Sequence, residues 1–401
     1  MSKVLFLNIP SHGHINPTLG LVDGLVKQGE EVIYFSSDEF KEKVENAGAV
    51  FKSYGEKSNF FVPKNKIPSN SIINDLLNRI DEVLNTSEDI IQYILKQIEG
   101  IKFDYIVYGS MFPFGNVISQ ILKIPAISSF AVFAKPKVFM SKNNEELIKN
   151  HPAVDTYKKL YNRLNEKYGV HMPPMLDLFF NKGDLNIAYT SKYFISNMID
   201  NYDDSFIFIG PPIYDRKENI EFPFEKLKDK KVVYISLGTV FNNTNDKLYE
   251  IFFKTFANYD GIIVMTAYNI DISKFDIPNN FIVKNYVPQS EILKYADVAV
   301  THAGMNSTSD LLYNNVPFVT IPIGADQRYI SGRVSELGSA ISLDKDTLTP
   351  EILRNSIEKV LTDPNYLDNI KKINNSFKEA GGYKKAIDEI IKFKKELKVK
   401  L

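Results

Sequence analysis

The chain has 401 residues, 44% of them hydrophobic, which is enough for two domains with complete cores. Its formal charge of −1 and pI near 6.6 give no reason to expect a nucleic-acid partner. Disulfides and thiolate metal sites are excluded because there is no cysteine, and no apolar stretch approaches the roughly 18 residues of a membrane span, so no stable membrane association is expected.

The first half of the chain alternates strand and helix patterns. Residues 4–9 (VLFLNI) form an apolar run that predicts a strand and is too short for a signal peptide, which fits a cytoplasmic protein. Asn16 and Pro17 predict the N-cap and first residue of a helix ending near Gln28. The other expected elements are strands over 31–35, 50–54, 105–108, 127–130, 186–190 and 207–209, and helices over 40–46, 72–98 and 116–122. This alternation predicts a doubly wound parallel sheet.

A second alternation follows a segment rich in proline and charge. We expect residues 213–230 to be an interdomain linker between an N-terminal domain, 1–212, and a C-terminal domain, 231–380. The expected strands are 232–237, 262–266, 281–285, 296–301, 318–322 and 340–343, and the expected helices are 246–259, 305–313, 329–337, 350–361, 364–380 and, after two glycines, 383–398.

Polar residues gather where one strand of the second half ends. The sequence Thr301-His302-Ala303-Gly304 leads into a helix, and Gly304 allows a tight turn there. The unpaired N–H groups and the positive end of the helix dipole suit a phosphate. Asn306 and Ser307 add side-chain donors, His302 adds a ring N–H, and Asp310 is placed to accept from ribose hydroxyls.

Two further strand ends carry similar groups. Asp326 and Gln327 follow the next strand, and Thr239 ends the sequence Ser236-Leu237-Gly238-Thr239 after the first strand of this half. Open α/β sheets bind ligands at the carboxyl ends of their strands, so these residues predict one ligand site.

In order and spacing, residues 286–327 resemble the nucleotide-sugar signature of family 1 glycosyltransferases, in particular the bacterial macrolide-type branch. The resemblance rests on Pro288-Gln289, His302-x-Gly304-x-Asn306-Ser307, Pro317, Pro322 and Asp326-Gln327. It implies a GT-B fold: two Rossmann-like, doubly wound parallel-sheet domains facing across a cleft, with residues 381–401 packing back on the N-terminal domain. The alternative is an ordinary strand–helix–strand unit with polar loops.

The resemblance also implies roles for the donor-site residues. Thr239 would contact phosphate, Val287 and Gln289 would hold uracil, and Asp326 and Gln327 would position the sugar hydroxyls. No metal is required, because a helix N-terminus and loop donors can stabilise the departing UDP. The only Asp-x-Asp sequence, at 344–346, lies between a strand and a capped helix and is interpreted as a turn.

A glycosyl acceptor needs a base, and histidine suits this near neutral pH. His12 and His14 lie at the carboxyl end of the first strand. The pattern His12-Gly13-His14-x-x-Pro17 resembles the family's signature, which implies that His14 is the base and His12 a structural residue. A metal site on these two histidines is an alternative, but no third ligand is indicated.

The chain departs from the family's pattern at Gly109. Relatives place an aspartate there, which hydrogen-bonds the base, whereas this chain reads Tyr108-Gly109-Ser110-Met111. Three interpretations stay open: acceptors that ionise easily, such as phenols; a substitute carboxylate; or weak or lost catalysis.

The aromatic stretch over residues 131–180 is expected to form helices and loops over the sheet's carboxyl edge. Part of it would line an apolar acceptor pocket, for which Met111, Phe112 and Phe133 are the candidates; for any one of them simple core packing is an equal alternative.

Together these features predict a metal-independent, inverting glycosyltransferase. The hexose, glucose by preference, would pass from a UDP-sugar to a hydroxyl of a small acceptor such as a flavonoid or macrolide, and the protein would be a monomer or weak homodimer. One alternative is a nucleotide-sugar-binding protein that Gly109 has made inactive. Another is a lipid-linked sugar transferase, although residues 55–100 show no apolar or basic membrane patch.

Overall fold

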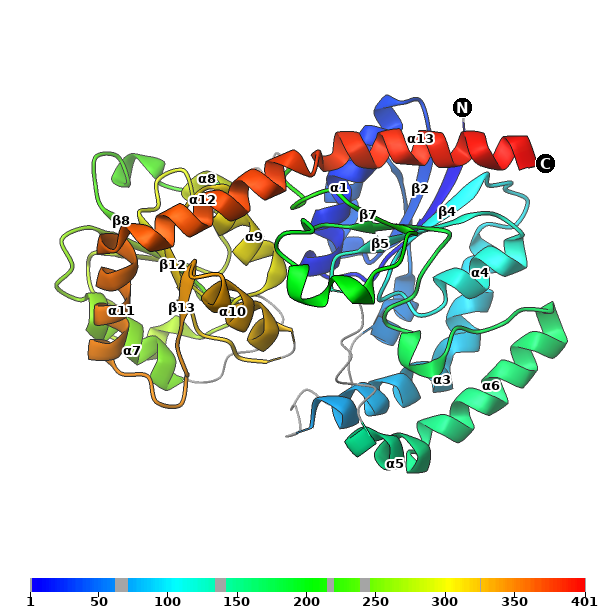
Figure 1. Ribbon diagram of the computed structural model, residues 1–401, viewed down its shortest axis with the longest axis horizontal. Coiled ribbons are helices and arrows are strands. Elements are labelled where there is room, and N and C mark those ends of the chain that lie inside the picture. Colours follow the sequence, from blue (N-terminus) through cyan, green and yellow to red (C-terminus); the bar gives the residue numbers. More distant parts are fainter. Residues whose placement is uncertain are drawn as a thin grey trace. The chain divides into compact units, whose positions relative to one another are not determined.

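A computed structural model describes residues 2–61, 71–133, 142–214, 220–238, 246–324 and 326–400 (Figure 1). The chain divides into two compact units. Unit 1 consists of Met1–Arg216 and Ala380–Leu401, and unit 2 consists of Lys217–Glu379. Unit 2 is therefore one continuous segment, whereas both ends of the chain contribute to unit 1.

Unit 1 is built on a seven-stranded parallel sheet with the order β3-β2-β1-β4-β5-β6-β7. The strands are β1 (Lys3–Leu7), β2 (Glu31–Ser36), β3 (Val50–Ser53), β4 (Tyr105–Gly109), β5 (Ala126–Phe130), β6 (Leu185–Ala188) and β7 (Phe206–Phe208). The chain starts at β1 inside the sheet, winds outward to β3, and then returns to fill the other side from β4. This order confirms the doubly wound sheet predicted from the alternating pattern.

Helices cover both faces of this sheet. They are α1 (His12–Lys27), α2 (Lys41–Asn46), α3 (Ile72–Gln97), α4 (Gly115–Leu122), α5 (Lys142–Asn150), α6 (Ala153–Tyr168) and α13 (Gly382–Lys400), with short 3-10 turns η1 (Asp38–Phe40), η2 (Gly55–Phe61), η4 (Met175–Asp177) and η5 (Ser196–Asn201). Because side chains alternate along a strand, Val4 and Phe6 share a core with α1 and α13, whereas Leu5 and Leu7 share one with α3.

Helix α1 begins five residues earlier than the sequence predicts. Its N-cap is Ser11, and Pro17 lies inside the helix, so Asn16 is not the N-cap. Pro17 is the sixth residue of the helix and has no N–H, so the bond that residue 17 would make to the Gly13 carbonyl is absent. The correction places His14 in the first turn of α1 rather than in a loop before it.

The aromatic stretch divides into two parts. Helix α6 contacts α3 (Figure 1) and buries Ala153, Leu160 and Leu164 in the core that α3 also enters, so it does not cover the strand ends as predicted. The loop after it does reach them, because the Asn181 N–H donates to the Ser110 carbonyl at 2.9 Å, just beyond β4.

Helix α13 packs along unit 1 beside α1 (Figure 1), with Ala386 and Ile390 fully buried. The Tyr383 hydroxyl donates to the carbonyl of Pro17 at 2.7 Å. Gly20 makes room for the Tyr383 ring, because a Cβ at position 20 would overlap it. Further along the helix, Lys394 pairs with Glu30 of the turn before β2.

Unit 2 is built on a six-stranded parallel sheet with the order β10-β9-β8-β11-β12-β13. The strands are β8 (Val232–Ser236), β9 (Ile262–Thr266), β10 (Phe281–Lys284), β11 (Val298–Thr301), β12 (Phe318–Thr320) and β13 (Ala340–Ser342). The helices are α7 (Asp246–Phe256), α8 (Gln289–Ile292), α9 (Met305–Tyr313), α10 (Gln327–Glu336), α11 (Pro350–Thr362) and α12 (Pro364–Glu379), with η6 (Phe224–Lys226) and η7 (Ile272–Lys274). Helices α7 and α11 bury their apolar sides in one core with the strands.

Part of the expected linker belongs to unit 2. Phe222 and Leu227 are buried, and the Phe224 ring lies 5.8 Å from that of Tyr295. Residues 220–230 are therefore packed against unit 2 rather than forming a free connection.

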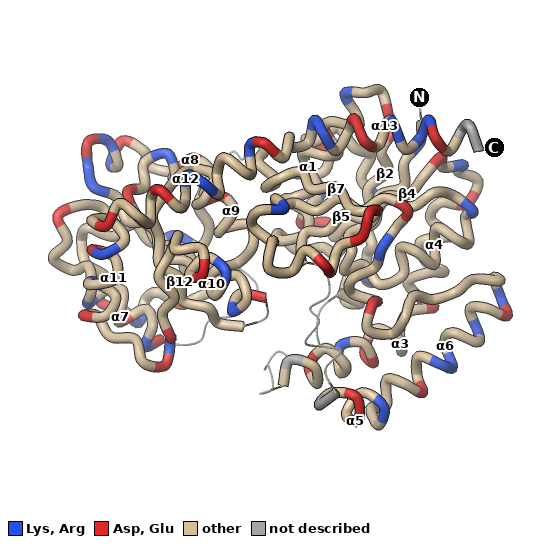
Figure 2. The backbone as a smooth tube through the Cα atoms, viewed as in Figure 1, with Lys and Arg blue, Asp and Glu red and all other residues tan. Residues whose placement is uncertain are grey.

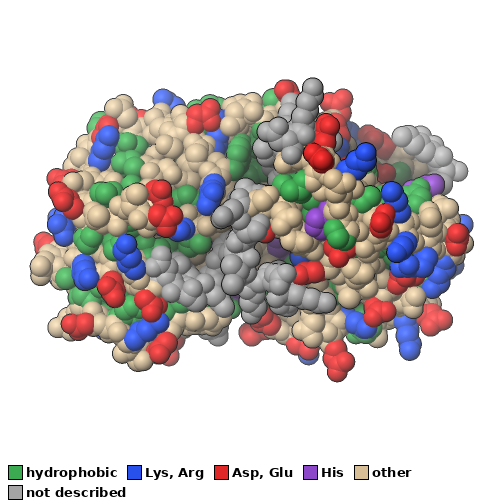
Figure 3. Space-filling view, turned by 90° about the horizontal axis from the view of Figure 1, so that it is seen from below, with side chains coloured by type: hydrophobic (Ala, Val, Ile, Leu, Met, Phe, Trp, Pro, Cys, Tyr) green, Lys and Arg blue, Asp and Glu red, His purple; other side chains and the backbone are tan. Residues whose placement is uncertain are grey.

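Basic and acidic residues are interspersed along the described backbone (Figure 2). The described surface seen in Figure 3 likewise carries both signs side by side. Many form local pairs, such as Lys384 and Asp388 on α13, whose charged atoms lie 3.0 Å apart. Within the described ranges, no helix is both long enough and apolar enough to cross a bilayer.

Candidate active site

The predicted donor-binding residues follow three adjacent strands of unit 2. Strands β8, β11 and β12 are neighbours and parallel, so their carboxyl ends lie at one edge of the sheet. His302 and Gly304 follow β11, and Asp326 and Gln327 follow β12. The predicted phosphate contact of β8, Thr239, lies outside the described residues. The strand order thus explains why residues far apart in the sequence gather here.

His302 is held between two glycine-containing loops. The residue is 9% exposed, and Nδ1 lies 3.4 Å from the Ser236 carbonyl oxygen. A carbonyl can only accept, so Nδ1 carries the proton and Nε2 has a lone pair when the ring is neutral. Burial lowers the pKa of His302 to about 4. The neutral ring therefore directs its N–H at the protein, not at the ligand site as the sequence suggested.

Two glycines leave room for this ring. A Cβ on Gly238 would lie 2.5 Å from Nε2 of His302, and one on Gly304 would overlap the same atom. Gly304 has φ −66°, so the tight turn predicted there does not use the left-handed region at Gly304; Ala303, with φ +63°, occupies that region instead. Gly304 is needed for space, not for its backbone freedom.

Helix α9 presents its N-terminus at the same edge. Gly304 is its N-cap, and the first helical bond runs from the Thr308 N–H to the Gly304 carbonyl at 2.9 Å. The N–H groups of residues 304–307 precede that bond and have no intrahelical partner. Asn306 and Ser307 lie half-buried in this first turn. The arrangement suits an anion such as a diphosphate.

Gln289, Asp310 and Tyr234 form a connected group. The Gln289 Nε2 donates to Asp310 Oδ2 at 2.7 Å, and the Tyr234 hydroxyl donates to Gln289 Oε1 at 3.0 Å. This links β8, α8 and α9 and fixes the Gln289 amide. Val287, just before α8, is buried, which leaves its main chain as the group that would hold the uracil ring. The structure therefore brings together predicted residues from two separate motifs.

The loop after β12 is closed by Gln327. The residue is 4% exposed, and its Oε1 accepts from the N–H groups of Ile323 at 2.8 Å and Gly324 at 3.1 Å. Its amide NH₂ is then the end that can donate to a ligand. Asp326 is the N-cap residue of α10, and burial raises the pKa of its carboxyl. Sequence reasoning identified both residues but not the loop-closing role of Gln327.

His14 lies in the first turn of α1 in unit 1 and is half-buried. Burial lowers the pKa of its ring to about 4. Within the described part of the chain, no carboxylate hydrogen-bonds this ring, so the structure offers no substitute for the missing aspartate there. His12 instead contacts Glu39 at 3.5 Å and packs edge-on against Phe40.

Asn8 is a buried polar residue of this region that sequence reasoning missed. It is 1% exposed at the end of β1, and its amide donates to the His14 carbonyl oxygen at 2.8 Å. A signal was present, because an asparagine that interrupts an apolar strand at its carboxyl end needs buried hydrogen-bond partners. The partners themselves could not be read from the sequence.

The three candidate acceptor residues differ in exposure. Phe112 is fully buried and packs near Tyr54 and Phe61, at ring distances of 6.4 and 5.8 Å, so it contacts the core. Met111 is half-buried against the same core. Phe133 is 5% exposed and stacks near Phe194 at 6.3 Å. In this conformation Met111 is the most accessible of the three.

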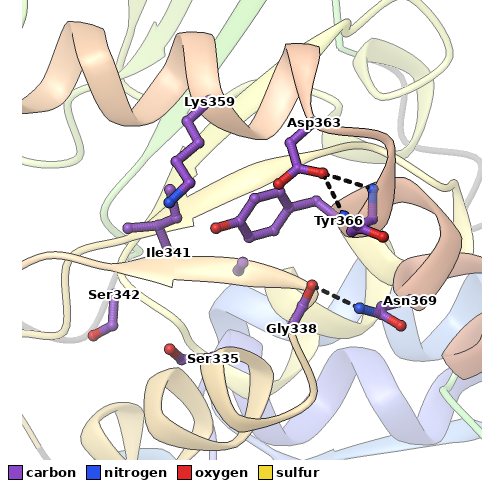
Figure 4. A pocket seen from close by; sticks show the side chains of 10 residues that line it. Ser335, Gly338, Ile341, Ser342, Lys359, Asp363, Tyr366 and Asn369 are labelled. Carbon is purple, nitrogen blue, oxygen red and sulfur yellow. Dashed lines mark hydrogen bonds between the residues drawn. The ribbon is translucent and has the colours of Figure 1, made fainter.

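A surface pocket of about 410 Å³ lies elsewhere in unit 2, between β13, α10, α11 and α12 (Figure 4). Its polar groups are used locally: Asn369 donates to the Gly338 carbonyl at 3.1 Å, and Asp363 accepts from Asn365. None of its lining residues is a predicted donor-site residue. The strand-end cluster, rather than this pocket, is therefore the candidate site.

The two buried histidines predict a loss of stability in acid. Unfolded histidine has a pKa near 6.5, whereas folded His14 and His302 have a pKa of about 4. Between these two pKa values the histidine is protonated only in the unfolded state. The free energy of unfolding therefore falls as the pH drops from 6.5 to 4. We expect each histidine to account for about 2 kcal/mol of the unfolding free energy lost between pH 7 and 5.

Urea unfolding at pH 7 and 5 measures this loss. The loss should be smaller in His14→Gln and in His302→Gln than in the parent chain, whatever the stability of each variant at pH 7. An equal loss in the parent and both variants would contradict the assignment.

Comparisons with known proteins point to one family. The family model "UDP-glucoronosyl and UDP-glucosyl transferase" matches residues 217–380, which span the strand-end cluster. The uncharacterized UDP-glucosyltransferase YojK of Bacillus subtilis is 33% identical over 402 residues, covering 99% of this chain and 98% of that protein. The NDP-glycosyltransferase YjiC of the same organism is 31% identical, covering 98% and 97%.

Solved structures support the fold. The glycotransferase of kitacinnamycin matches with a TM-score of 0.80 at 25% identity, covering 97% of this chain and 98% of that one. The calicheamicin glycosyltransferase CalG4 matches with a TM-score of 0.77 at 25% identity, covering 98% of each. Taken with two parallel-sheet α/β units and the strand-end cluster, these relatives show that the chain belongs to the UDP-glucuronosyl and UDP-glucosyl transferase family, family 1 of the GT-B glycosyltransferases, and is a UDP-sugar-dependent glycosyltransferase.

Proposed function

We propose that the enzyme transfers a hexose, preferentially glucose, from UDP to a hydroxyl of a small apolar or aromatic acceptor, inverts the anomeric centre and needs no metal. The observation that carries the donor part is the convergence of the α9 N-terminus, the His302 ring between Gly238 and Gly304, and the Gln289–Asp310 pair at one sheet edge. Glucose is supported by relatives described as UDP-glucosyltransferases.

In the proposed reaction, His14 removes the acceptor proton with its neutral ring. The acceptor oxygen then attacks the anomeric carbon on the face opposite UDP. The bond between that carbon and the UDP oxygen breaks, and UDP leaves with the electron pair. The N–H groups of residues 304–307 offset the charge that develops on the diphosphate. Asp326 and Gln327 hold the sugar hydroxyls.

The acceptor class follows from the base. A neutral histidine with a lowered pKa is available at neutral pH but is a weak base. Acceptors that lose a proton easily would therefore react best, which favours phenols such as flavonoids over aliphatic alcohols. The oleandomycin glycosyltransferase of Streptomyces antibioticus is among the relatives, so macrolides with aliphatic hydroxyls are the second class of acceptor to assay.

Mass spectrometry tests the proposal directly. The protein is incubated with EDTA, with UDP-glucose or dTDP-glucose, and with a panel of phenols and macrolides. We expect a product heavier by one hexose, fastest with UDP-glucose and a phenol, and a rate unchanged by EDTA. Transfer that requires added metal, or that prefers dTDP-glucose, would contradict it.

Asp326→Asn provides a sharper test of the sugar site. This substitution keeps the size of the side chain but removes its charge, so kcat/KM for UDP-glucose should fall roughly 10- to 100-fold. The affinity for UDP alone, measured by calorimetry, should stay unchanged because UDP lacks the sugar. Equal effects on both ligands would place Asp326 at the nucleotide instead.

The second candidate is a nucleotide-sugar-binding protein without transfer, and Gly109 is the observation that favours it. Such a protein would bind UDP and UDP-glucose by calorimetry but give no product with any acceptor. The same two measurements therefore separate the candidates.

A further inference from the structure

Asn8 and Gly109 lie beside each other at the carboxyl ends of two paired strands. Leu7 of β1 is in register with Tyr108 of β4, so the next residues along each strand are Asn8 and Gly109. Asn8 is 1% exposed. A buried amide at this place must satisfy both its oxygen and its two N–H groups.

The Asn8 amide can satisfy its oxygen and its N–H groups in one orientation only. Its Oδ1 accepts from the Ile9 N–H at 2.9 Å, and its Nδ2 donates to the His14 carbonyl at 2.8 Å. Because an N–H only donates and a carbonyl only accepts, the positions of oxygen and nitrogen cannot be exchanged. The second Nδ2 hydrogen goes to the Tyr34 hydroxyl at 3.0 Å.

From Tyr34 the hydrogen bonds continue to the next peptide group of α1. The Thr18 hydroxyl donates to the Ile15 carbonyl at 2.8 Å, and its oxygen lies 2.8 Å from the Tyr34 oxygen. Each hydroxyl has one hydrogen, so Tyr34 donates to Thr18. Burial raises the pKa of Tyr34, which keeps it protonated for this role. Asn8 thus holds the His14 carbonyl from the buried side, and Tyr34 bonds to Thr18, whose hydroxyl holds the next carbonyl, that of Ile15.

Gly109 is the residue that leaves space for this arrangement. A Cβ at position 109 would overlap Oδ1 of Asn8 and would lie 3.1 Å from its Cγ. Gly109 is not among the residues with positive φ, so its backbone conformation does not call for glycine. The space that the Asn8 amide fills is what requires it.

We propose that Asn8 is a positioning residue that holds the base His14 by its main chain, and that Asn8 and Gly109 are a coupled pair, because a side chain at 109 displaces the Asn8 amide. The inference rests on the proposed role of His14. It also explains how this chain fixes the base without a carboxylate at position 109. The amide orients the turn and adds no charge to the ring.

A double-mutant cycle tests the coupling. Gly109→Ala should lower kcat/KM for transfer about tenfold or more in the parent chain but less than about twofold when Asn8→Ala is already present, because the displaced amide is then gone. Asn8→Asp keeps the volume of the side chain but loses its N–H donors, so it should lower kcat/KM for transfer by about as much as Gly109→Ala does. The matched control is Gly332→Ala on α10, where a Cβ meets nothing within 4 Å.

A second readout does not depend on transfer. The imidazole ¹³C resonance of His14, identified by its loss in His14→Gln, is titrated in the same variants. Gly109→Ala should move the titration midpoint from about 4 toward the ordinary value near 6.5, as the turn loosens and the ring becomes solvated. In the Asn8→Ala background, Gly109→Ala should add no further shift.

The outcomes separate this inference from the proposed function. Additive effects in both readouts, or a Gly109→Ala variant that matches Gly332→Ala, would overturn the coupling. If the parent chain transfers no sugar to any acceptor but the titration shows the coupling, the proposed function fails and the structural pairing of Asn8 with Gly109 stands. If His14→Gln retains full activity, Asn8 has no base to position and the inference is overturned with it.

Discussion

Replacing His14 with glutamine is expected to lower kcat for sugar transfer by roughly 10²- to 10⁴-fold, the usual contribution of a general base. Glutamine keeps the approximate size of the ring but accepts no proton. The affinity for UDP should not change, because the predicted donor residues belong to unit 2. Steady-state kinetics with a phenolic acceptor, together with calorimetry of UDP binding, measure both quantities.

The matched control is His12→Gln, two residues away in the same turn. Its ring contacts Glu39 and Phe40 and is not the proposed base, so kcat should change less than about threefold. The loss in His14→Gln should also shrink as the acceptor becomes more acidic, since an ionised phenol needs no base. Equal losses in the two variants, or a His14→Gln loss independent of acceptor acidity, would contradict the assignment.

Replacing Lys394 with methionine is expected to destabilise unit 1 by about 2–4 kcal/mol. Lys394 of α13 and the Tyr105 hydroxyl of β4 both bond to the Glu30 carboxylate, whose side chain is 5% exposed. Methionine fills similar space but leaves that carboxylate without its cation in a place that water barely reaches. Lys394 is itself 21% exposed, which keeps the expected loss below that of a fully buried pair.

Lys384→Met is the control on the same helix. Lys384 and Asp388 are 87% and 60% exposed, so removing this pair should change stability by less than about 0.5 kcal/mol. Hydrogen exchange by mass spectrometry should show faster exchange across α13 and β4 in Lys394→Met only. Equal exchange in the two variants would mean that the Glu30 pair contributes no more than a surface ion pair.

Much of the fold follows from patterns of a few residues. The apolar run over 262–266 predicts β9, and the helix over 305–313 coincides with α9, because both signals are local. The gathering of His302, Asp326 and Gln327 also follows, since parallel strands align their carboxyl ends. Short patterns and one general rule about sheets therefore locate the candidate donor site.

What the sequence does not reveal are contacts between distant segments. Gly109 looks like a missing carboxylate until Asn8, 101 residues earlier, is found in the space beside it. Gly304 is missed for another reason: it looks like a turn residue, but it leaves room for the ring of His302, two residues earlier, and the direction of that ring cannot be read from the sequence. The early start of α1 is missed for a different reason: Asn16 and Pro17 carry strong cap signals, but Ser11 takes the N-cap position. Local propensity is then overruled by the surrounding structure.

The division of unit 1 between the two ends of the chain has a consequence for its synthesis. Unit 2 is continuous, so Lys217–Glu379 can fold once it has left the ribosome. Unit 1 cannot complete its core at that point, because Ala386, Ile387 and Ile390 belong to it. The domain that is made first is therefore finished last, and until α13 arrives the part of α1 that Tyr383 and Ile387 cover stays exposed.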